Sequence, residues 1–297
     1  MKKAILIMLA AVFLSAGAGL SGETYKIGVL AKNGPVKAME MWEATGDYLA
    51  AKISGKIFEV VPLDFEAVYP AVESGQVAFF LVNSSMFVTA KVKYGAAAVA
   101  TMINFRQGQP LKSFGGVIFT SADNEDIKAL ADLRGKTFMA VKKSSFGGWQ
   151  MAYKEMLDAG IVPQKDLAQL KFGGKHDNVV LAVQNGTVEA GTVRTDTLER
   201  MAASGLIDMD EFRIIAKKSH AGFPFVCSTA LYPEWPLAKT RDTPDAVVQQ
   251  VIQALKQLKA DDPAAKSAKI VGWTDALDYG PVEELQKSLK VGAYAGS

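Results

Sequence analysis

The spacing of apolar and polar residues changes repeatedly along the chain and predicts alternating strands and helices. Short apolar runs closed by turn residues are typical of buried strands, whereas apolar residues every three or four positions are typical of helices. The first part of the chain shows strands at 24–30, 58–62 and 77–82, which alternate with helices at 37–52 and 65–74. Such alternation is typical of parallel sheets covered by helices.

A second alternating series begins after residue 135. It comprises strands at 136–142 and 188–193 and helices at 149–159, 177–185 and 195–204. No internal repeat or low-complexity segment separates the two series. Two series of this kind are better explained by two lobes than by one large domain.

The segments that flank the second series predict how the lobes are joined. Crossover strands are expected at 115–120 and at 212–216, the latter leading into a buried strand at 225–229. Amphipathic helices at 244–258 and 282–289 would pack back on the first lobe. We therefore expect an α/β protein in which each lobe is a mostly parallel sheet flanked by helices, with two hinge strands, lobe 1 at 23–117 and 225–297, and lobe 2 at 118–224.

The first residues predict export. Lys2 and Lys3 precede the apolar run 4–14, and a small-residue cleavage pattern follows at 16–18. Residues 1–22 therefore have the features of a cleavable secretory signal peptide. Because no cysteine follows the apolar run, we expect a periplasmic protein without a lipid anchor.

Charge and cysteine content exclude several classes of protein. The 33 Lys and Arg residues include Lys2 and Lys3, so cleavage leaves 31 basic residues against 31 Asp and Glu residues. A neutral chain lacks the broad positive field that nucleic-acid binding requires, and it must capture anions with a few local donors. The single cysteine, Cys227, excludes an internal disulfide and is expected to be a small core residue.

Four loops at predicted strand-to-helix junctions are rich in hydrogen-bond donors. In open α/β sheets, ligands bind at such junctions, beyond the carboxyl ends of strands. Since Ser, Thr, Asn and Asp also cap helices, each loop alone has a structural explanation, whereas four together favour an anion site. The loops are Asn83-Ser84-Ser85, the loop 143–149 with Ser144, Ser145, Gly147, Gly148 and Trp149, the turn 173–177 with His176, and Arg194-Thr195-Asp196.

The residue types in these loops suit an oxyanion. Ser144 and Ser145 are hydroxyl donors, and the glycines that follow let the backbone approach a ligand. Arg194 is predicted to supply the positive charge, with a surface ion pair to Asp196 or Glu199 as the alternative. His176 is either a ligand contact or a structural histidine, and Trp149 is either a core residue or a wall of the pocket.

The sequence shows none of the catalytic or metal-binding motifs that would suggest another chemistry. It has no His, Cys and Asp cluster with metal-ligand spacing, no Gly-x-Ser-x-Gly elbow and no phosphate-binding Gly-x-x-x-x-Gly-Lys-Ser/Thr loop. We therefore expect binding without catalysis, metal or cofactor.

These motifs resemble those of the phosphate, phosphite and phosphonate solute-binding proteins of ABC importers, which have the type II periplasmic-binding fold. The loop 143–149 resembles the family's Ser-Thr-Ser-Gly-aromatic loop, and Gly174-Lys175-His176-Asp177 is similar to its Ser/Gly-His-Asp turn. The resemblance implies a protein that delivers a small oxyanion to a membrane permease, and we expect it to be a monomer. It also implies that the anion's oxygens are bound by Ser84, Ser144, Ser145, Gly147 and His176, with Thr120 nearby.

A second resemblance leaves the role open. The segments 115–119, 191–196 and 231–236 are similar to the periplasmic sensor regions of tetrathionate-type histidine kinases. That resemblance makes a sulfur oxyanion such as tetrathionate or thiosulfate the alternative ligand, and a sensor kinase the alternative partner. Where aminoalkylphosphonate binders carry acidic residues for the substrate's ammonium group, this chain has Arg194, which favours a ligand with more negative charge or with a second anionic group.

Overall fold

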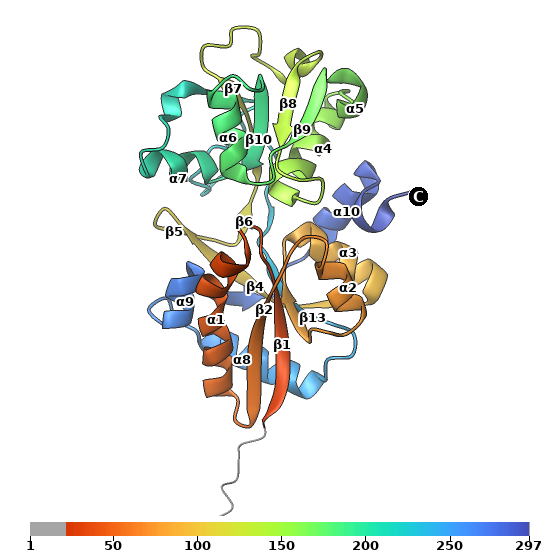
Figure 1. The fold of residues 1–297 in the computed structure, drawn as a ribbon, viewed down its shortest axis with the longest axis vertical. Helices are drawn as coiled ribbons and strands as arrows, with labels where there is room; N and C mark the ends of the chain where they lie inside the picture. The colour runs from red at the N-terminus through yellow and green to blue at the C-terminus, as the bar shows by residue number, and fades with distance from the viewer. Residues whose placement is uncertain (1–21, 297) are drawn as a thin grey trace, which may run out of the picture.

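The computed structural model describes residues 22–296, which form two lobes stacked along the long axis of the molecule (Figure 1). The predicted signal peptide lies outside these residues, apart from Gly22. Within the described part of the chain, every helix is too short or too polar to cross a bilayer.

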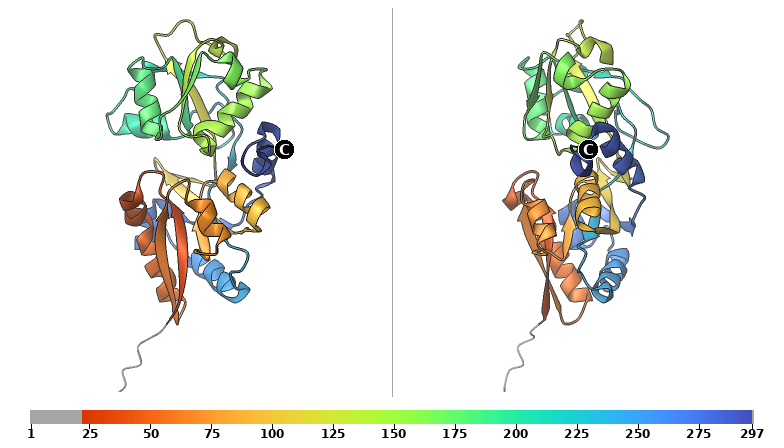
Figure 2. Two further views of the ribbon diagram at one scale, coloured as in Figure 1. Left: turned by 45° about the vertical axis from the view of Figure 1, so that its right-hand side comes forward. Right: turned by 90° about the vertical axis from the view of Figure 1, so that its right-hand side faces the viewer.

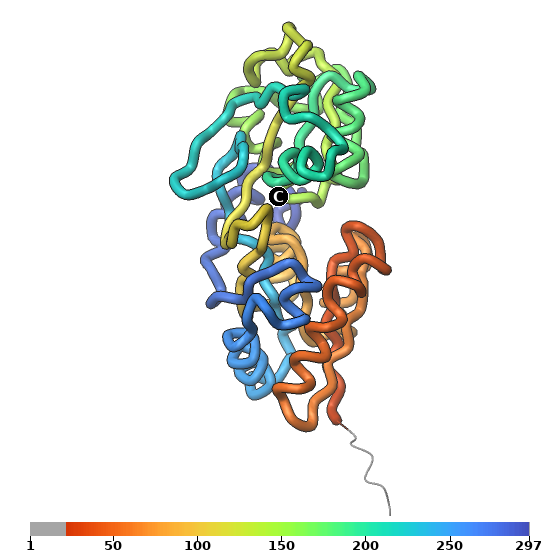
Figure 3. The backbone as a smooth tube through the Cα atoms, turned by 90° about the vertical axis from the view of Figure 1, so that its left-hand side faces the viewer, coloured from red at the N-terminus to blue at the C-terminus, as the bar shows by residue number. Residues whose placement is uncertain are grey.

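Lobe 1 contains a mixed sheet with the strand order β14-β4-β13-β3-β1-β2, and β5 pairs with β4. Its strands are β1 (Glu23–Leu30), β2 (Lys56–Leu63), β3 (Phe79–Leu81), β4 (Ala97–Arg106), β5 (Gln109–Leu111), β13 (Pro236–Lys239) and β14 (Ile270–Asp275). The helices that accompany it are α1 (Pro35–Lys52), α2 (Val68–Glu73), α3 (Ser84–Tyr94), α8 (Asp245–Gln257), α9 (Pro263–Ala268) and α10 (Gly280–Leu289). The first and last segments of the described chain, red and blue in Figure 3, therefore share one lobe, and the chain ends near the junction with lobe 2.

Lobe 2 is formed by the middle of the chain around a sheet with the order β11-β7-β10-β8-β9. Its strands are β7 (Gly116–Ser121), β8 (Thr137–Ala140), β9 (Gln169–Phe172), β10 (Ala190–Arg194) and β11 (Phe212–Ile215). Its helices are α4 (Met151–Asp158), α5 (Pro163–Asp166), α6 (His176–Gln184) and α7 (Thr197–Ala203). Apolar side chains alternate along these strands, so that Val117 and Phe119 join one buried cluster and Ile118 joins another.

The prediction of mostly parallel sheets was wrong, because both sheets are mixed. β1 is parallel to β2 and β3, and β8 is parallel to β9 and β10, but β13 and β7 run antiparallel to their neighbours. Both β13 and β7 receive the chain from the other lobe. They enter their sheets at the edge where the parallel strands end, and they must therefore run in the opposite direction.

A short two-stranded ribbon joins the lobes. β6 (Ser113–Phe114) pairs antiparallel with β12 (Tyr232–Pro233), and α10 lies beside this connection, close to both α3 and α4 (Figure 2). The chain therefore crosses a few residues before and after the predicted boundaries at 117 and 225. Thr120, which was expected near the hinge, lies inside the lobe 2 sheet.

The predicted buried strand at 225–229 is not a strand, and it is buried only at Cys227, Ser228 and Thr229, whereas Phe225 and Val226 are half-buried. The segment has no strand pairing, and Cys227 is a buried free thiol, as expected of a core residue. Ser228 and Thr229 bond to the backbone of β7 through their side chains, Ser228 Oγ accepting from Ile118 N and Thr229 Oγ1 accepting from Gly116 N. Together with the Ser228 backbone N–H, which donates to the Gly116 carbonyl at 2.9 Å, these hydroxyls attach the segment to β7.

Candidate functional site

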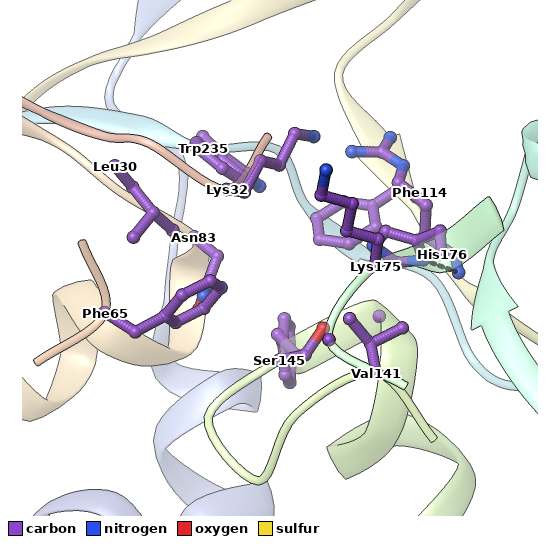
Figure 4. Close-up of a pocket in the computed structure, with 14 residues that line it drawn as sticks. Leu30, Lys32, Phe65, Asn83, Phe114, Val141, Ser145, Lys175, His176 and Trp235 are labelled. Atoms are coloured by element: carbon purple, nitrogen blue, oxygen red, sulfur yellow. Dashed lines mark hydrogen bonds between the residues drawn. The ribbon is translucent and has the colours of Figure 1, made fainter. Parts of the chain in front are cut away.

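A small cavity lies between the lobes, where strands from both sheets end (Figure 4). Lys32 and Asn83 follow β1 and β3 of lobe 1, and they face Ser145 and His176, which follow β8 and β9 of lobe 2. We call this space of about 30 Å³ the inner cavity; it is lined by Leu30, Lys32, Phe65, Asn83, Phe114, Val141, Ser145, Phe146, Gly147, Gly174, Lys175, His176, Arg194 and Trp235.

The loop after β8 reaches the inner cavity through a π-helical turn, Phe146–Gln150. Such turns are rare and occur frequently at functional sites. Phe146 packs edge-on against Phe114 and Tyr232 of the connecting ribbon, with ring centroids 6.0 and 5.0 Å away. These contacts fix the loop against the ribbon and place Ser145, which is 6% exposed, at the cavity wall.

The two glycines of this loop are required by close packing. A Cβ atom on Gly147 would lie 2.9 Å from Arg194 Cβ and 2.9 Å from a ring carbon of Phe114. A Cβ atom on Gly148 would lie 2.5 Å from a methyl group of Val141. The structure therefore requires glycine at both positions for packing against neighbouring side chains, and Gly147 also lines the cavity. The predicted approach of this backbone to a ligand stays a prediction.

His176 is the first residue of α6 and a neutral donor toward the cavity. Its Nδ1 accepts a hydrogen bond from the Arg194 backbone N–H at 3.2 Å. Burial, together with the nearby cations Lys32 and Arg194, lowers the pKa of His176 well below its ordinary value. An imidazole that accepts at Nδ1 and is neutral carries its hydrogen on Nε2, so it can donate one hydrogen bond to an anion.

The guanidinium of Arg194 lines the inner cavity but is already paired with carboxylates. Its Nη2 donates to Glu234 at 2.7 Å and its Nε to Asp196 at 3.1 Å. The guanidinium carbon also lies 4.4 Å from the centre of the Phe114 ring. Burial opposes the charge of Arg194, but Glu234 and Asp196 outweigh it and raise the pKa.

The sequence therefore predicted one partner of Arg194 correctly and missed the other. Asp196 pairs with it as expected, but in a buried site instead of at the surface. The other alternative, Glu199, instead accepts a hydrogen bond from the Val226 backbone. Glu234 is fully buried and lies in the connection to β13, forty positions away. The segment 231–236 was singled out for its resemblance to sensor regions, but nothing in it indicated that Glu234 pairs with Arg194.

Lys32 is a site residue that the sequence motifs did not single out. It follows β1, and its ammonium nitrogen lies 4.8 Å from the centre of the Trp235 ring. Burial and the cations Arg194 and Arg106 lower the pKa of Lys32 to about 7. The rule that ligands bind beyond the carboxyl ends of strands would have found Lys32, because it applies to β1 as well as to β8.

Several predicted ligand residues of lobe 1 and the lobe interface are not at the inner cavity. The hydroxyl of Ser84 donates to the Pro233 carbonyl at 2.6 Å, and that of Ser85 donates to Gln150 Oε1 at 2.5 Å. Ser144 contributes its carbonyl, which accepts from Asn83 Nδ2 at 3.2 Å across the lobes. These serines therefore stabilise the junction around the cavity.

The remaining predicted residues serve lobe 2 itself. Thr120 Oγ1 donates to the Glu189 carbonyl, and Thr195 Oγ1 accepts from Gly115 N. Trp149 is buried and stacks on Tyr153 with a centroid distance of 5.0 Å, which supports its interpretation as a core residue. Gly148 is not among the residues that line the inner cavity. Of the residues predicted to bind ligand, the structure brings four to the cavity: Ser145, Gly147, His176 and Arg194.

Residues 27–279 match the family described as "ABC transporter, phosphonate, periplasmic substrate-binding protein". The chain belongs to this family. The match covers both lobes and confirms the resemblance inferred from the loop 143–149 and the turn 173–177. We refer to it below as the phosphonate-binding family.

Two curated relatives are similar to this chain over much of its length. The tetrathionate sensor histidine kinase TtrS of Salmonella typhimurium is 32% identical over 287 residues, which cover 96% of this chain but 47% of the kinase. The chain thus spans about half the length of that relative. The phosphate-import protein PhnD of Mycolicibacterium smegmatis is 25% identical over 238 residues, covering 76% of this chain and 68% of PhnD.

A solved structure of the phosphonate-binding family confirms the type II periplasmic-binding fold. PhnD1 of Prochlorococcus marinus, determined in complex with methylphosphonate, superimposes with a TM-score of 0.70 at 14% identity, covering 90% of this chain and 98% of PhnD1. At this level of identity the likeness concerns the fold.

Proposed function

We propose that this chain is a periplasmic solute-binding protein, exported through its signal peptide, that captures a small oxyanion between its lobes and presents it to an ABC permease. The observation that supports this function is the composition of the inner cavity wall. Hydrogen-bond donors and cations come from both lobes, among them Lys32, Ser145 and His176, and no carboxylate lines the cavity among the residues described. An anion can therefore bind without facing a repelling charge.

The donors are sufficient for useful affinity. A hydrogen bond to a charged group contributes about 1.5–3 kcal/mol net. Contacts from Ser145, His176 and Lys32 could together offset the cost of ordering two lobes and give binding at about micromolar concentration. Since Asn83 and Ser144 already meet across the lobes, a bound anion would favour the closed arrangement by adding contacts to both sides.

A sensing role is the second candidate. It is favoured by the 32% identity to the tetrathionate kinase, which exceeds the 25% identity to the phosphate-import protein. In that case the ligand is a sulfur oxyanion and the partner is a sensor kinase. The cavity wall disfavours aminoalkylphosphonates in either role, because it offers no carboxylate for an ammonium group among the described residues.

Thermal unfolding of the signal-free protein tests both candidates. The panel is phosphate, phosphite, methylphosphonate, 2-aminoethylphosphonate, sulfate, thiosulfate and tetrathionate. A ligand at about one hundred times its dissociation constant adds about 2.7 kcal/mol, which raises the midpoint by several degrees. A shift with a phosphorus anion supports import, and a shift with a sulfur anion supports sensing. If no member shifts the midpoint, the oxyanion function is wrong.

Replacing Ser145 by alanine is expected to weaken binding of the panel ligand about tenfold or more. The change removes a hydroxyl donor from the cavity wall, and the net loss of a charged hydrogen bond corresponds to that factor. Isothermal titration calorimetry provides the measurement. Ser144→Ala is the matched control, because Ser144 contacts Asn83 through its carbonyl and not through its hydroxyl. The ligand affinity of this variant should stay within about twofold of that of the unchanged protein. Equal losses in both variants would contradict the placement of the site.

Binding is expected to weaken as the pH rises above 7. The pKa of Lys32 is lowered to about 7 by burial, Arg194 and Arg106, against the attraction of Asp196 and Glu234. An anion beside Lys32 favours the charged form of the lysine. Above about pH 7, Lys32 of the free protein is mostly neutral, so it must take up a proton when the anion binds. Affinity is therefore full below about pH 7 and falls by up to about tenfold per pH unit above it.

The affinity for sulfate or thiosulfate between about pH 6 and pH 9 measures this effect, because neither anion changes charge in that range. His176 does not contribute to the effect, since its pKa lies well below its ordinary value and it stays neutral. A Lys32→Met variant should bind more weakly and lose the pH dependence. A slope that persists in this variant would show that another group titrates.

A further inference from the structure

A second and larger cavity adjoins the inner one between the lobes. It measures about 340 Å³, compared with about 30 Å³ for the inner cavity, and we call it the outer cavity. The two share four lining residues, Lys32, Lys175, His176 and Arg194, so they lie side by side with these side chains at their boundary. Lys32 and Lys175 approach this boundary from opposite lobes (Figure 4). The outer cavity is large enough for part of a small-molecule ligand.

The outer cavity is strongly cationic. Beyond the three cations that it shares with the inner cavity, it is lined by Lys37, Arg106, Arg200 and Lys269. Only two carboxylates line it within residues 22–296, Asp177 and Asp196. Cations from both lobes therefore converge on one space with too few carboxylates to balance them.

The two carboxylates are already used by arginines. Asp177 pairs with Arg200, and Asp196 accepts from Arg194 and lies 3.6 Å from Arg106 Nε. In the described part of the chain, Lys32, Lys175 and Lys269 form no ion pair. Lys37 and Arg194 also pair with Glu40 and Glu234, which do not line the cavity. The charge of the three lysines is therefore left for a ligand, and a single small anion in the inner cavity would not reach all of it.

Arg106 provides an independent sign of a missing partner. It is the last residue of β4, its side chain is 17% exposed, and its Nε is buried without a hydrogen-bond partner among the described residues. Asp196 is too far for a hydrogen bond, and Arg194 and Arg200 repel the Arg106 charge. A buried, charged donor at a cavity wall that has no hydrogen-bond partner is suited to a second anionic group.

We propose that the two cavities bind the two ends of one elongated ligand that carries two anionic groups, such as a disulfonate, a diphosphonate or a polythionate. One end meets Ser145 and His176 in the inner cavity, and the other meets Arg106 and Lys269 in the outer cavity. The inference rests on the proposed function and specifies its ligand class. Linking two anionic groups makes the second contact intramolecular, which raises affinity about a hundredfold or more over a one-ended analogue.

Matched pairs of ligands test this inference by calorimetry on the signal-free protein. The pairs are ethanesulfonate with ethanedisulfonate, ethylphosphonate with ethylenediphosphonate, and thiosulfate with tetrathionate. We expect one pair at least to show about a hundredfold tighter binding of the two-ended member, with one ligand per protein. Equal affinities within every pair that binds would overturn the inference and leave the proposed function standing. The inference would also be overturned if two one-ended anions bound per protein and the linked, two-ended ligand bound no more tightly than one of them.

Variants of the protein test the contacts of the two ligand ends separately. Lys269→Gln removes an exposed charge of the outer cavity and should weaken the two-ended ligand about tenfold while leaving its one-ended analogue within about twofold. Ser145→Ala should weaken both members of the pair. Lys165→Gln, an exposed lysine of α5 outside both cavities, is the control and should change neither. Equal effects of Lys269→Gln on both members would contradict the two-ended ligand, and failure of all ligands to bind would overturn the proposed function with it.

Discussion

Replacing Glu234 by alanine is expected to lower the free energy of unfolding by about 3–5 kcal/mol, because it leaves the buried guanidinium of Arg194 without its main partner. Glu234 is fully buried and accepts from Arg194 at 2.7 Å and from Asn104 at 3.0 Å. Burial would raise the pKa of Glu234, but Arg194 and Asn104 outweigh it and hold the pKa below its ordinary value, so the carboxylate is charged. In a chain of this size the loss corresponds to a fall in Tm of roughly 10 °C.

The measurement is unfolding by urea, followed by circular dichroism. Glu40→Ala is the control, because Glu40 forms an exposed ion pair with Lys37 on α1 and should change the free energy by less than about 0.5 kcal/mol. A double variant, Arg194→Met with Glu234→Leu, should recover most of the stability, since apolar residues of similar volume can replace a buried pair. A loss below about 1 kcal/mol in Glu234→Ala would show that the pair is not sealed from water.

Replacing Gly147 by valine is expected to reduce ligand affinity at least about a hundredfold. The new Cβ would lie 2.9 Å from Arg194 Cβ and from the Phe114 ring, and the added methyl groups would occupy the cavity wall. The variant should also lose about 1–3 kcal/mol of stability from overpacking, so binding must be measured well below its Tm. Calorimetry with the ligand found by the unfolding panel gives the affinity.

Gly108→Ala separates the loss of stability from the loss of binding. Gly108 lies in the turn between β4 and β5 with a φ of +78°, and nothing lies within 4 Å of an added Cβ. The substitution should cost about 1–2 kcal/mol through backbone strain and leave the affinity unchanged. If Gly147→Val bound within about threefold of the parent chain, the loop 143–149 would not be part of the site.

The sequence predicted much of the fold because its local signals agree with the tertiary structure. The predicted helix at 37–52 is α1, and the predicted strand at 58–62 lies within β2. β4 was missed, since its first half is rich in alanine, which has a low strand propensity. The antiparallel entry of β7 and β13 was missed as well, because local periodicity does not record the direction from which the chain arrives.

The difference between local sequence signals and contacts made by the fold also explains which residues of the candidate site were predicted. Ser145, Gly147 and His176 were found because the loops that carry them are recognisable by composition alone. Ser85 was assigned to the ligand on the same ground, but its hydroxyl is taken by Gln150, which lies 65 positions later in lobe 2. Glu234 could not be predicted for a similar reason, since its partner Arg194 is forty positions earlier. Donors are local features of a sequence, whereas their partners depend on the folded chain.

The place of β13 in the sheet of lobe 1 has a consequence for the order of folding. β13 lies between β3 and β4, although it follows the whole of lobe 2 in the chain. The sheet of lobe 2 needs only residues 116–215 and can form from one continuous segment. The sheet of lobe 1 stays divided until β13 arrives, and such non-local pairing is slow. During synthesis, β1, β2 and β3 therefore cannot complete their lobe before the last third of the chain has been made.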